Sequence, residues 1–140
     1  GYAYGAEAIT EVELCRFERD KLETLFESHR GLERRLFEIA NDELAVAQDQ
    51  MLLLGRKTAK ERMASFLLKL SEREELRGGR DGAVYLPMVQ EDIADYLGLT
   101  IETVSRTISQ LKRDGLIRQS SSHEFELLST EGLEDISEPM

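Results

Sequence analysis

Apolar residues recur with helical spacing through much of the chain, interrupted by short stretches of alternating, strand-like spacing. The earliest stretch, Ala8 to Phe17, alternates between two faces and predicts one strand. A short helix is expected at 20–28 and a long helix from about 31 to 56. A lone strand is unstable without neighbours, and no hairpin partner follows it nearby. We therefore expect the sequence to begin inside a sheet whose other strands are absent.

The long helix carries two apolar stripes. One is an uncharged heptad seam, with spacings of three and four residues: Phe37, Ala40, Leu44, Ala47, Met51 and Leu54. The second stripe runs beside it and consists of Leu32, Leu36, Ile39, Val46 and Leu53. Both stripes can pack within one monomer. Because a chain of 140 residues has few side chains with which to bury two stripes, we favour a parallel homodimer through a dimerisation helix at 29–56.

The remaining pattern predicts a small domain at 57–140. Its first helix opens with Thr58 and Glu61, a capping-box pair in which each side chain satisfies an exposed backbone amide, and extends to about Arg77. Short strands are expected at 83–86, 116–119 and 124–128, the last two as a hairpin, and a final helix at 130–136. The predicted fold class is mainly α with small β, a long dimerisation helix followed by a winged helix-turn-helix domain.

The helix-turn-helix is predicted by the spacing within 90–109. Ala94 is a small residue where the two helices touch, Gly98 tolerates the positive φ of the turn, and Thr100 can N-cap the second helix. Gly115 is expected to end that helix. The buried faces are expected to come from Ile93, Leu97, Leu99, Val104 and Ile108.

The second helix of this motif exposes polar side chains on the half expected to enter a DNA major groove. We predict base contacts by Glu102, Ser105 and Arg106, because a guanidinium can donate twice to guanine and a carboxylate can accept from cytosine. The predicted phosphate contacts are Thr103, Thr107, Lys112, Arg113 and Arg118, with Arg56 and Lys57 as further candidates. Alternatively, Glu102 and Arg106 form only a surface ion pair and the basic residues are solvated charges.

The net charge of −10 would ordinarily disfavour a nucleic-acid partner. The acidic residues, however, gather at the two ends of the chain: residues 56–122 sum to +2, and 123–140 hold six acidic residues and no Lys or Arg. A rival interpretation is a protein-interaction or assembly module whose winged helix packs on another protein. That interpretation predicts an apolar exposed face on the second helix, whereas the face expected here is polar.

Other classes of protein lack support in the sequence. No uncharged apolar run of 18 residues is long enough to span a membrane and no signal peptide opens the chain, so the cytosol is expected. His29 and His123 have no neighbouring metal-ligand partner and are expected at the surface. No acid/base pair, glycine-rich phosphate loop or metal-ligand spacing occurs, so we predict that the chain is no enzyme.

Four stretches resemble the CRP/FNR superfamily of bacterial transcription regulators, most closely its FNR/FixK branch. They are Asp49-Gln-Met-Leu-Leu-Leu54, Glu61-Arg-Met-Ala-Ser-Phe66, the segment from Asp92 to Arg106, and Asp114-Gly-Leu-Ile117. Glu102, Ser105 and Arg106 match the E-x-x-S-R recognition signature of that branch. The resemblance implies a homodimeric regulator, an activator, that binds a palindrome with half-sites like TTGAT and has RNA polymerase as a partner.

The resemblance also implies that the N-terminal β-roll sensor of the family is missing apart from its last strand, so that residues 1–28 are its remnant with a short helix. Cys15, the only cysteine, stands where oxygen-sensing members carry an iron–sulfur ligand near the dimer helix. The other three cysteines of that set are absent, and a cluster needs about four ligands. We expect no cofactor in this chain and interpret Cys15 as a plain strand cysteine; the alternative is a cluster ligand in a longer parent protein.

Overall fold

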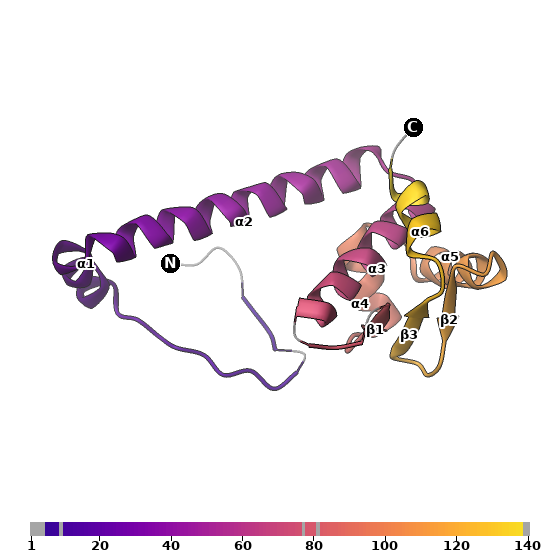
Figure 1. Cartoon of the computed structure of the whole chain (residues 1–140), viewed down its shortest axis with the longest axis horizontal. Coiled ribbons are helices and arrows are strands. Elements are labelled where there is room, and N and C mark those ends of the chain that lie inside the picture. The colour runs from indigo at the N-terminus through magenta and orange to yellow at the C-terminus, as the bar shows by residue number, and fades with distance from the viewer. Residues whose placement is uncertain (1–4, 9, 77, 81, 139–140) are drawn as a thin grey trace. The chain divides into compact units, whose positions relative to one another are not determined.

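The computed structural model describes residues 5–8, 10–76, 78–80 and 82–138 and divides into two compact units, residues 1–52 and 53–140. The elements are α1 (Arg19–Ser28), α2 (Arg30–Arg56), α3 (Ala59–Leu76), β1 (Ala83–Tyr85), α4 (Gln90–Leu97), α5 (Ile101–Arg113), β2 (Ile117–Gln119), β3 (Glu124–Leu127) and α6 (Thr130–Ser137) (Figure 1). The predicted fold class, mainly α with a small β part, is confirmed.

The first unit contains α1 and most of α2. As predicted, α2 is one uninterrupted helix, and it runs for 27 residues (Figure 1). No proline interrupts its backbone hydrogen bonds. Leu53 is the one buried residue of α2, and it belongs to the second unit, so the first unit buries none of the apolar residues of this helix.

The strand predicted at 8–17 is wrong for the described residues. Residues 8 and 10–17 have no strand structure, and Ile9 lies outside the described residues. Alternating apolar residues form a strand only where a neighbouring strand accepts their hydrogen bonds. The described part of the first unit contains helices and no strand that could pair with this segment.

The second unit packs four helices and a small sheet around one core. The predicted capping box opens α3: Thr58 N donates to Glu61 Oε2 at 2.9 Å, and Glu61 N donates to Thr58 Oγ1 at 3.4 Å. Burying a Leu or Met side chain contributes about 1.5–3 kcal/mol to stability, so the apolar side chains of this core are the main stabilising contacts of the unit. Its most deeply buried side chains include Met63, Leu67, Leu86, Leu97, Val104, Leu111 and Leu133.

The sheet has the order β1-β3-β2, with both pairs antiparallel. In the centre, Phe125 of β3 lies opposite Val84 on one side and Gln119 on the other. The predicted hairpin of β2 and β3 is confirmed and forms the wing. His29 is exposed as expected, but His123 is half-buried, and its Nδ1 lies 2.8 Å from the Leu86 carbonyl oxygen. No described helix is long and apolar enough to cross a membrane.

Candidate nucleic-acid interface

The helix-turn-helix consists of α4, a short turn and α5. Ala94 is buried where the helices approach, and Gly98 has a φ of 61°, the left-handed conformation that favours glycine. Thr100 caps α5 as predicted, since its Oγ1 accepts a hydrogen bond from Thr103 N at 3.2 Å. Asp114 forms the C-cap of α5, and Gly115 follows with a φ of 71°. The turn chemistry predicted from the sequence therefore positions α5.

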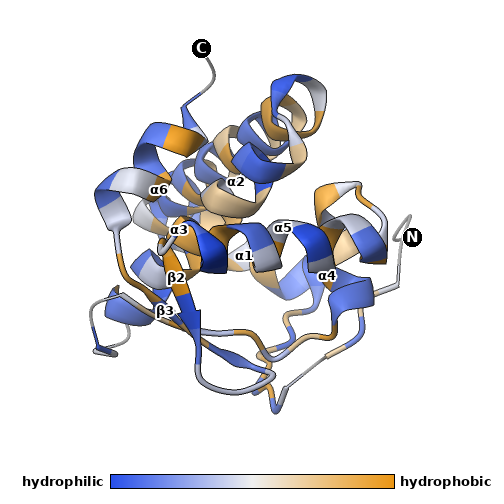
Figure 2. Ribbon diagram, turned by 90° about the vertical axis from the view of Figure 1, so that its right-hand side faces the viewer, coloured by the Kyte–Doolittle hydropathy of each residue, from blue (hydrophilic) through white to orange (hydrophobic). Residues whose placement is uncertain are grey.

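The two faces of α5 differ in polarity, and Figure 2 shows both hydrophilic and hydrophobic residues on this helix. Its exposed residues include Glu102, Ser105, Arg106 and Ser109. Its buried residues are Val104, Thr107, Ile108 and Leu111. Thr107 is only 6% exposed, so the predicted contact between its hydroxyl and a phosphate does not fit the structure. Thr107 follows Val104 by three residues and precedes Leu111 by four, and this spacing is the signal that places it on the buried stripe.

Arg106 and Glu102 do not form a direct ion pair in the structure. Arg106 Nη2 instead donates to Thr103 Oγ1 at 3.2 Å. The pKa of Glu102 is lowered from its ordinary value of 4.5, first because its carboxylate accepts from its own backbone amide. The Thr100 hydroxyl and the charge of Arg106 lower that pKa further. The carboxylate is therefore ionised at neutral pH, as an acceptor for cytosine N4 must be.

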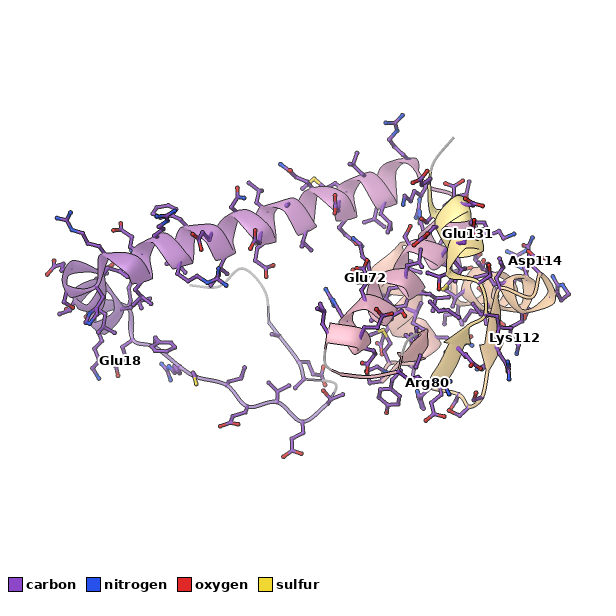
Figure 3. The ribbon with its side chains drawn as sticks, viewed as in Figure 1. Glu18, Glu72, Arg80, Lys112, Asp114 and Glu131 are labelled. Atoms are coloured by element: carbon purple, nitrogen blue, oxygen red, sulfur yellow. The ribbon has the colours of Figure 1, made fainter. Side chains whose placement is uncertain are left out.

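The predicted phosphate-binding cations lie at the end of α5 and on the wing. Lys112 Nζ donates to Gln119 Oε1 of β2 at 3.1 Å, and Figure 3 shows Lys112 on α5. Arg118 Nη2 lies 3.5 Å from Glu126 Oε2, with both side chains partly exposed. The side chain of Arg113 is exposed and makes no hydrogen bond or ion pair with the described residues.

Sequence reasoning missed Gln119 and Glu126, the partners that orient two of these cations. It also missed the ion pair between Lys60 Nζ of α3 and Asp114 Oδ2, which are 2.7 Å apart although 54 residues separate them. No local pattern signals such pairs, because they form only when distant segments pack. The candidate Lys57 donates to Ser65 Oγ at 2.7 Å, so its ammonium is engaged within the second unit.

The predicted dimer seam is exposed along α2. Leu44 is 56%, Met51 69% and Phe37 71% exposed, and the two alanines of the seam are exposed as well. Leu54, at the end of the seam, is 40% exposed. Contiguous exposed apolar surface of this kind typically marks an interaction site. The dimer itself stays a prediction.

Cys15 is exposed with a free thiol. Within the residues that the structure describes, no three His, Cys, Asp or Glu side chains gather as a metal site. A chain with a single cysteine also lacks the set of thiolates that an iron–sulfur cluster requires. The donor set of this chain therefore does not fit a cluster.

Comparison with known proteins gives a consistent result. The family model of the Crp-like helix-turn-helix domain matches residues 61–136. The nitrogen fixation regulation protein FixK of Bradyrhizobium diazoefficiens is 47% identical over 114 residues, which cover 81% of this chain and 48% of that protein. The transcriptional activator protein FnrL of Cereibacter sphaeroides is 44% identical over 119 residues, 82% of this chain and 48% of that protein.

Among solved structures, FixK2 from Bradyrhizobium japonicum has a TM-score of 0.79 and 40% sequence identity. The match covers 87% of this chain and 60% of that one. The chain spans about half the length of the curated relatives it matches. The family model covers more than half of the chain, including the whole helix-turn-helix. The chain belongs to the CRP/FNR family of transcription regulators, in its FNR/FixK branch.

Proposed function

We propose that this protein is a sequence-specific DNA-binding transcription regulator that acts as a homodimer on a palindrome. One observation carries the proposal: apart from Ile101, the exposed residues in the N-terminal half of α5 are polar, and the opposite face of the helix is buried in the core. A helix-turn-helix places this half of its second helix against base edges in the major groove. The residues on it are suited to that task.

Base reading is assigned to three exposed residues of α5. Arg106 donates two hydrogen bonds to O6 and N7 of a guanine, and Glu102 accepts one from N4 of a cytosine. Ser105 lies three residues after Glu102, about one helical turn further along, and contacts a neighbouring base. The ionised state of Glu102 and the hydrogen bond of Arg106 to Thr103 support this assignment. Half-sites like TTGAT are the expected target.

Phosphate contacts are assigned to Thr103, Lys112, Arg113 and Arg118. Arg113, which has no partner among the described residues, can bind a phosphate directly. Lys112 bonds the neutral amide of Gln119, and the partner of Arg118 is the partly exposed Glu126, so we assign to both cations the exchange of these partners for a phosphate. Thr107 is left out because it is buried. These contacts position the domain and carry no sequence information.

Dimerisation is assigned to the seam of α2. Two-fold symmetry then places one recognition helix in each of two half-sites about 34 Å apart, one helical turn of DNA, which requires a palindromic site. The name of FnrL describes a transcriptional activator, and activation with RNA polymerase as partner is our proposal for this chain as well.

The rival proposal, a protein-interaction module, has less support. The exposed residues of α5 are polar apart from Ile101 at its start and include Arg106, whereas a protein-binding face would be expected to carry apolar anchors at its centre. The residues around the helix-turn-helix, 56–122, sum to +2 despite the acidic total. This local charge is compatible with a DNA partner.

Binding to a duplex with the TTGAT palindrome, compared with a scrambled duplex at two salt concentrations, tests the proposal. We expect selective binding of two chains per palindromic duplex, with weaker and more uniform binding to the scrambled one. Equal affinity for both duplexes at both salt concentrations would contradict sequence-specific recognition. If only one chain binds each duplex and the selectivity is intact, the proposed dimer is contradicted, whereas sequence-specific recognition is not.

A further inference from the structure

Thr103 is the residue of α5 that holds the side chain of Arg106. Arg106 Nη2 donates to Thr103 Oγ1 at 3.2 Å, across one turn of the helix. Glu102 precedes Arg106 by four residues, a spacing at which opposite charges on a helix commonly pair, yet the two side chains form no direct ion pair. The guanidinium is therefore held by a neutral hydroxyl group and not by a carboxylate.

A second hydroxyl group continues this contact toward the start of α5. Thr103 Oγ1 lies 3.0 Å from Thr100 Oγ1, which also accepts from Thr103 N at 3.2 Å. The pKa of Glu102 is lowered first by its own backbone amide and then by a hydrogen bond from the Thr100 hydroxyl. Because Thr100 donates its hydrogen to Glu102, we assign Thr103 as the donor between the two hydroxyls. Hydrogen bonds then connect Arg106 to Glu102 through both threonines.

The burial of Thr103 makes its hydroxyl a well-defined anchor for a flexible side chain. Thr103 is half-buried and Arg106 is exposed. The χ1 angle of a β-branched residue is restricted in a helix, whereas an arginine without a partner has many rotamers, which binding to a base must reduce to one. A guanidinium has more N–H groups than a guanine can accept, so the bond to Thr103 leaves a donor pair free for O6 and N7.

We propose that Thr103 is a positioning residue for base reading, whose hydroxyl orders the Arg106 guanidinium before DNA binds and thereby strengthens the preference for guanine. The inference rests on the proposed function, because this ordering matters only if Arg106 reads a base. It gives Thr103 a second role beside the phosphate contact. A phosphate contact carries no sequence information, whereas an ordered Arg106 favours only DNA that presents its acceptors.

The guanine preference of each protein tests this proposal. It is the ratio of affinities for the TTGAT palindrome and for the same duplex with the G·C pair of each half-site replaced by A·T. Thr103→Val removes the hydroxyl and keeps the branched shape, whereas Thr103→Ser keeps the hydroxyl. Thr107→Val is the matched control, because it makes the same change on the same helix at a buried position.

We expect Thr103→Val to lower the guanine preference by about two- to tenfold per half-site, which corresponds to ordering one long side chain. Thr103→Ser and Thr107→Val should retain the preference. When Arg106→Ala is already present, adding Thr103→Val should leave the remaining preference unchanged, because the two residues act through one contact. If Thr103→Val does not fold, as judged by thermal unfolding, Thr103→Ala replaces it in the same comparison.

A measurement without DNA tests the ordering directly. NMR relaxation of the side-chain Nε–H groups compares Arg106 with Arg113, whose side chain has no partner among the described residues. In the wild type, Arg106 should be the more ordered of the two. In Thr103→Val the two side chains should become similarly mobile, and Thr103→Ser should restore the difference.

Three outcomes would overturn the inference. If Thr103→Val weakens binding to both duplexes equally, Thr103 contacts a phosphate and does not position Arg106. If Arg106 is as mobile as Arg113 in the wild type, its guanidinium is not ordered before binding. A wild type without any guanine preference would refute the proposed base reading itself, and the wild-type ratio therefore distinguishes this failure from the other two.

Discussion

α2 and α3 follow each other in the chain, yet they bury very different shares of their residues. α2 has 27 residues and buries only Leu53, whereas α3 has 18 residues and buries six. Both helices contain leucines and methionines at helical spacing. The helices of the second unit enclose a shared core, while the apolar seam of α2 is left exposed.

The difference indicates that apolar spacing alone does not say what a helix packs against. In proteins, most of the stability of a helix comes from packing of its apolar face, and the described residues of the first unit do not cover the seam of this 27-residue helix. Our proposal is that a second copy of the chain, packed seam to seam, covers this surface.

A charge in the seam should have the largest effect and tests whether α2 is completed by a second copy. Leu44→Glu places an uncompensated charge in each half of the seam and should weaken the dimer by about 3–5 kcal/mol. Ala45→Glu is the matched control, because it adds the same charge one residue away, off the seam. Sedimentation that is unchanged for Leu44→Glu, or equally changed for both variants, would remove the seam assignment.

A cavity in the core of the second unit tests whether that unit is stabilised within one chain. Leu111 is fully buried in the second unit, so Leu111→Ala should lower the free energy of unfolding by about 2–5 kcal/mol. The loss should be independent of protein concentration, because the core lies within one chain. Denaturant unfolding at several concentrations measures it. A loss that grows on dilution would mean that this unit also depends on a partner.

Base reading at the exposed face of α5 can be separated from phosphate binding. Arg106→Ala should cost about 1–3 kcal/mol per half-site on the palindrome and little on random DNA. Arg113→Ala should weaken binding to both kinds of DNA alike, and the slope of log affinity against log salt concentration should become shallower by about one. Binding titrations at several salt concentrations compare the two variants. Equal losses on both DNAs for Arg106→Ala would refute its role in base reading.

The smallest effect is expected at the cap of α5. Thr100→Ala removes the acceptor for Thr103 N and should cost about 1 kcal/mol of stability. It should also raise the pKa of Glu102 toward 4.5, because the Thr100 hydroxyl is one of the groups that lower it. An NMR titration of the Glu102 carboxyl group measures the shift, and an unchanged pKa would contradict this contact.

The sign of the pH dependence follows from that lowered pKa. A carboxyl group whose pKa is depressed in the folded state adds stability above its unfolded pKa, and the contribution is lost as the pH falls through the lower folded value. For Glu102 the loss should therefore occur below about pH 4.5 in the wild type. The effect should be small because the side chain is exposed.

Local sequence signals predicted most of the secondary structure. The capping box at Thr58, the left-handed turn at Gly98 and the cap at Thr100 each depend on residues within one turn of the chain. The hairpin of β2 and β3 was predicted from a polar turn between two short strands. Interactions between close neighbours are specified by spacing alone, so single-sequence reasoning can find them.

The predictions that the structure does not bear out are those that depend on packing, as two of them show. The segment at 8–17 has the alternation of a strand but no strand beside it in the described part of its unit. Thr107 was assigned to phosphate contact by its hydroxyl, although its side chain completes the buried stripe of α5. In both cases the residue types are compatible with the prediction, but the neighbouring residues in the folded chain are not.

The sequence by itself determined the family, the helix-turn-helix with its caps, and the polar face of α5, because these follow from residue identity and short-range spacing. Only the tertiary structure decided that Lys60 holds the end of α5. It also decided which cations of the wing have partners. These contacts join residues that are up to 54 positions apart, and such proximity arises only when the core brings distant segments together.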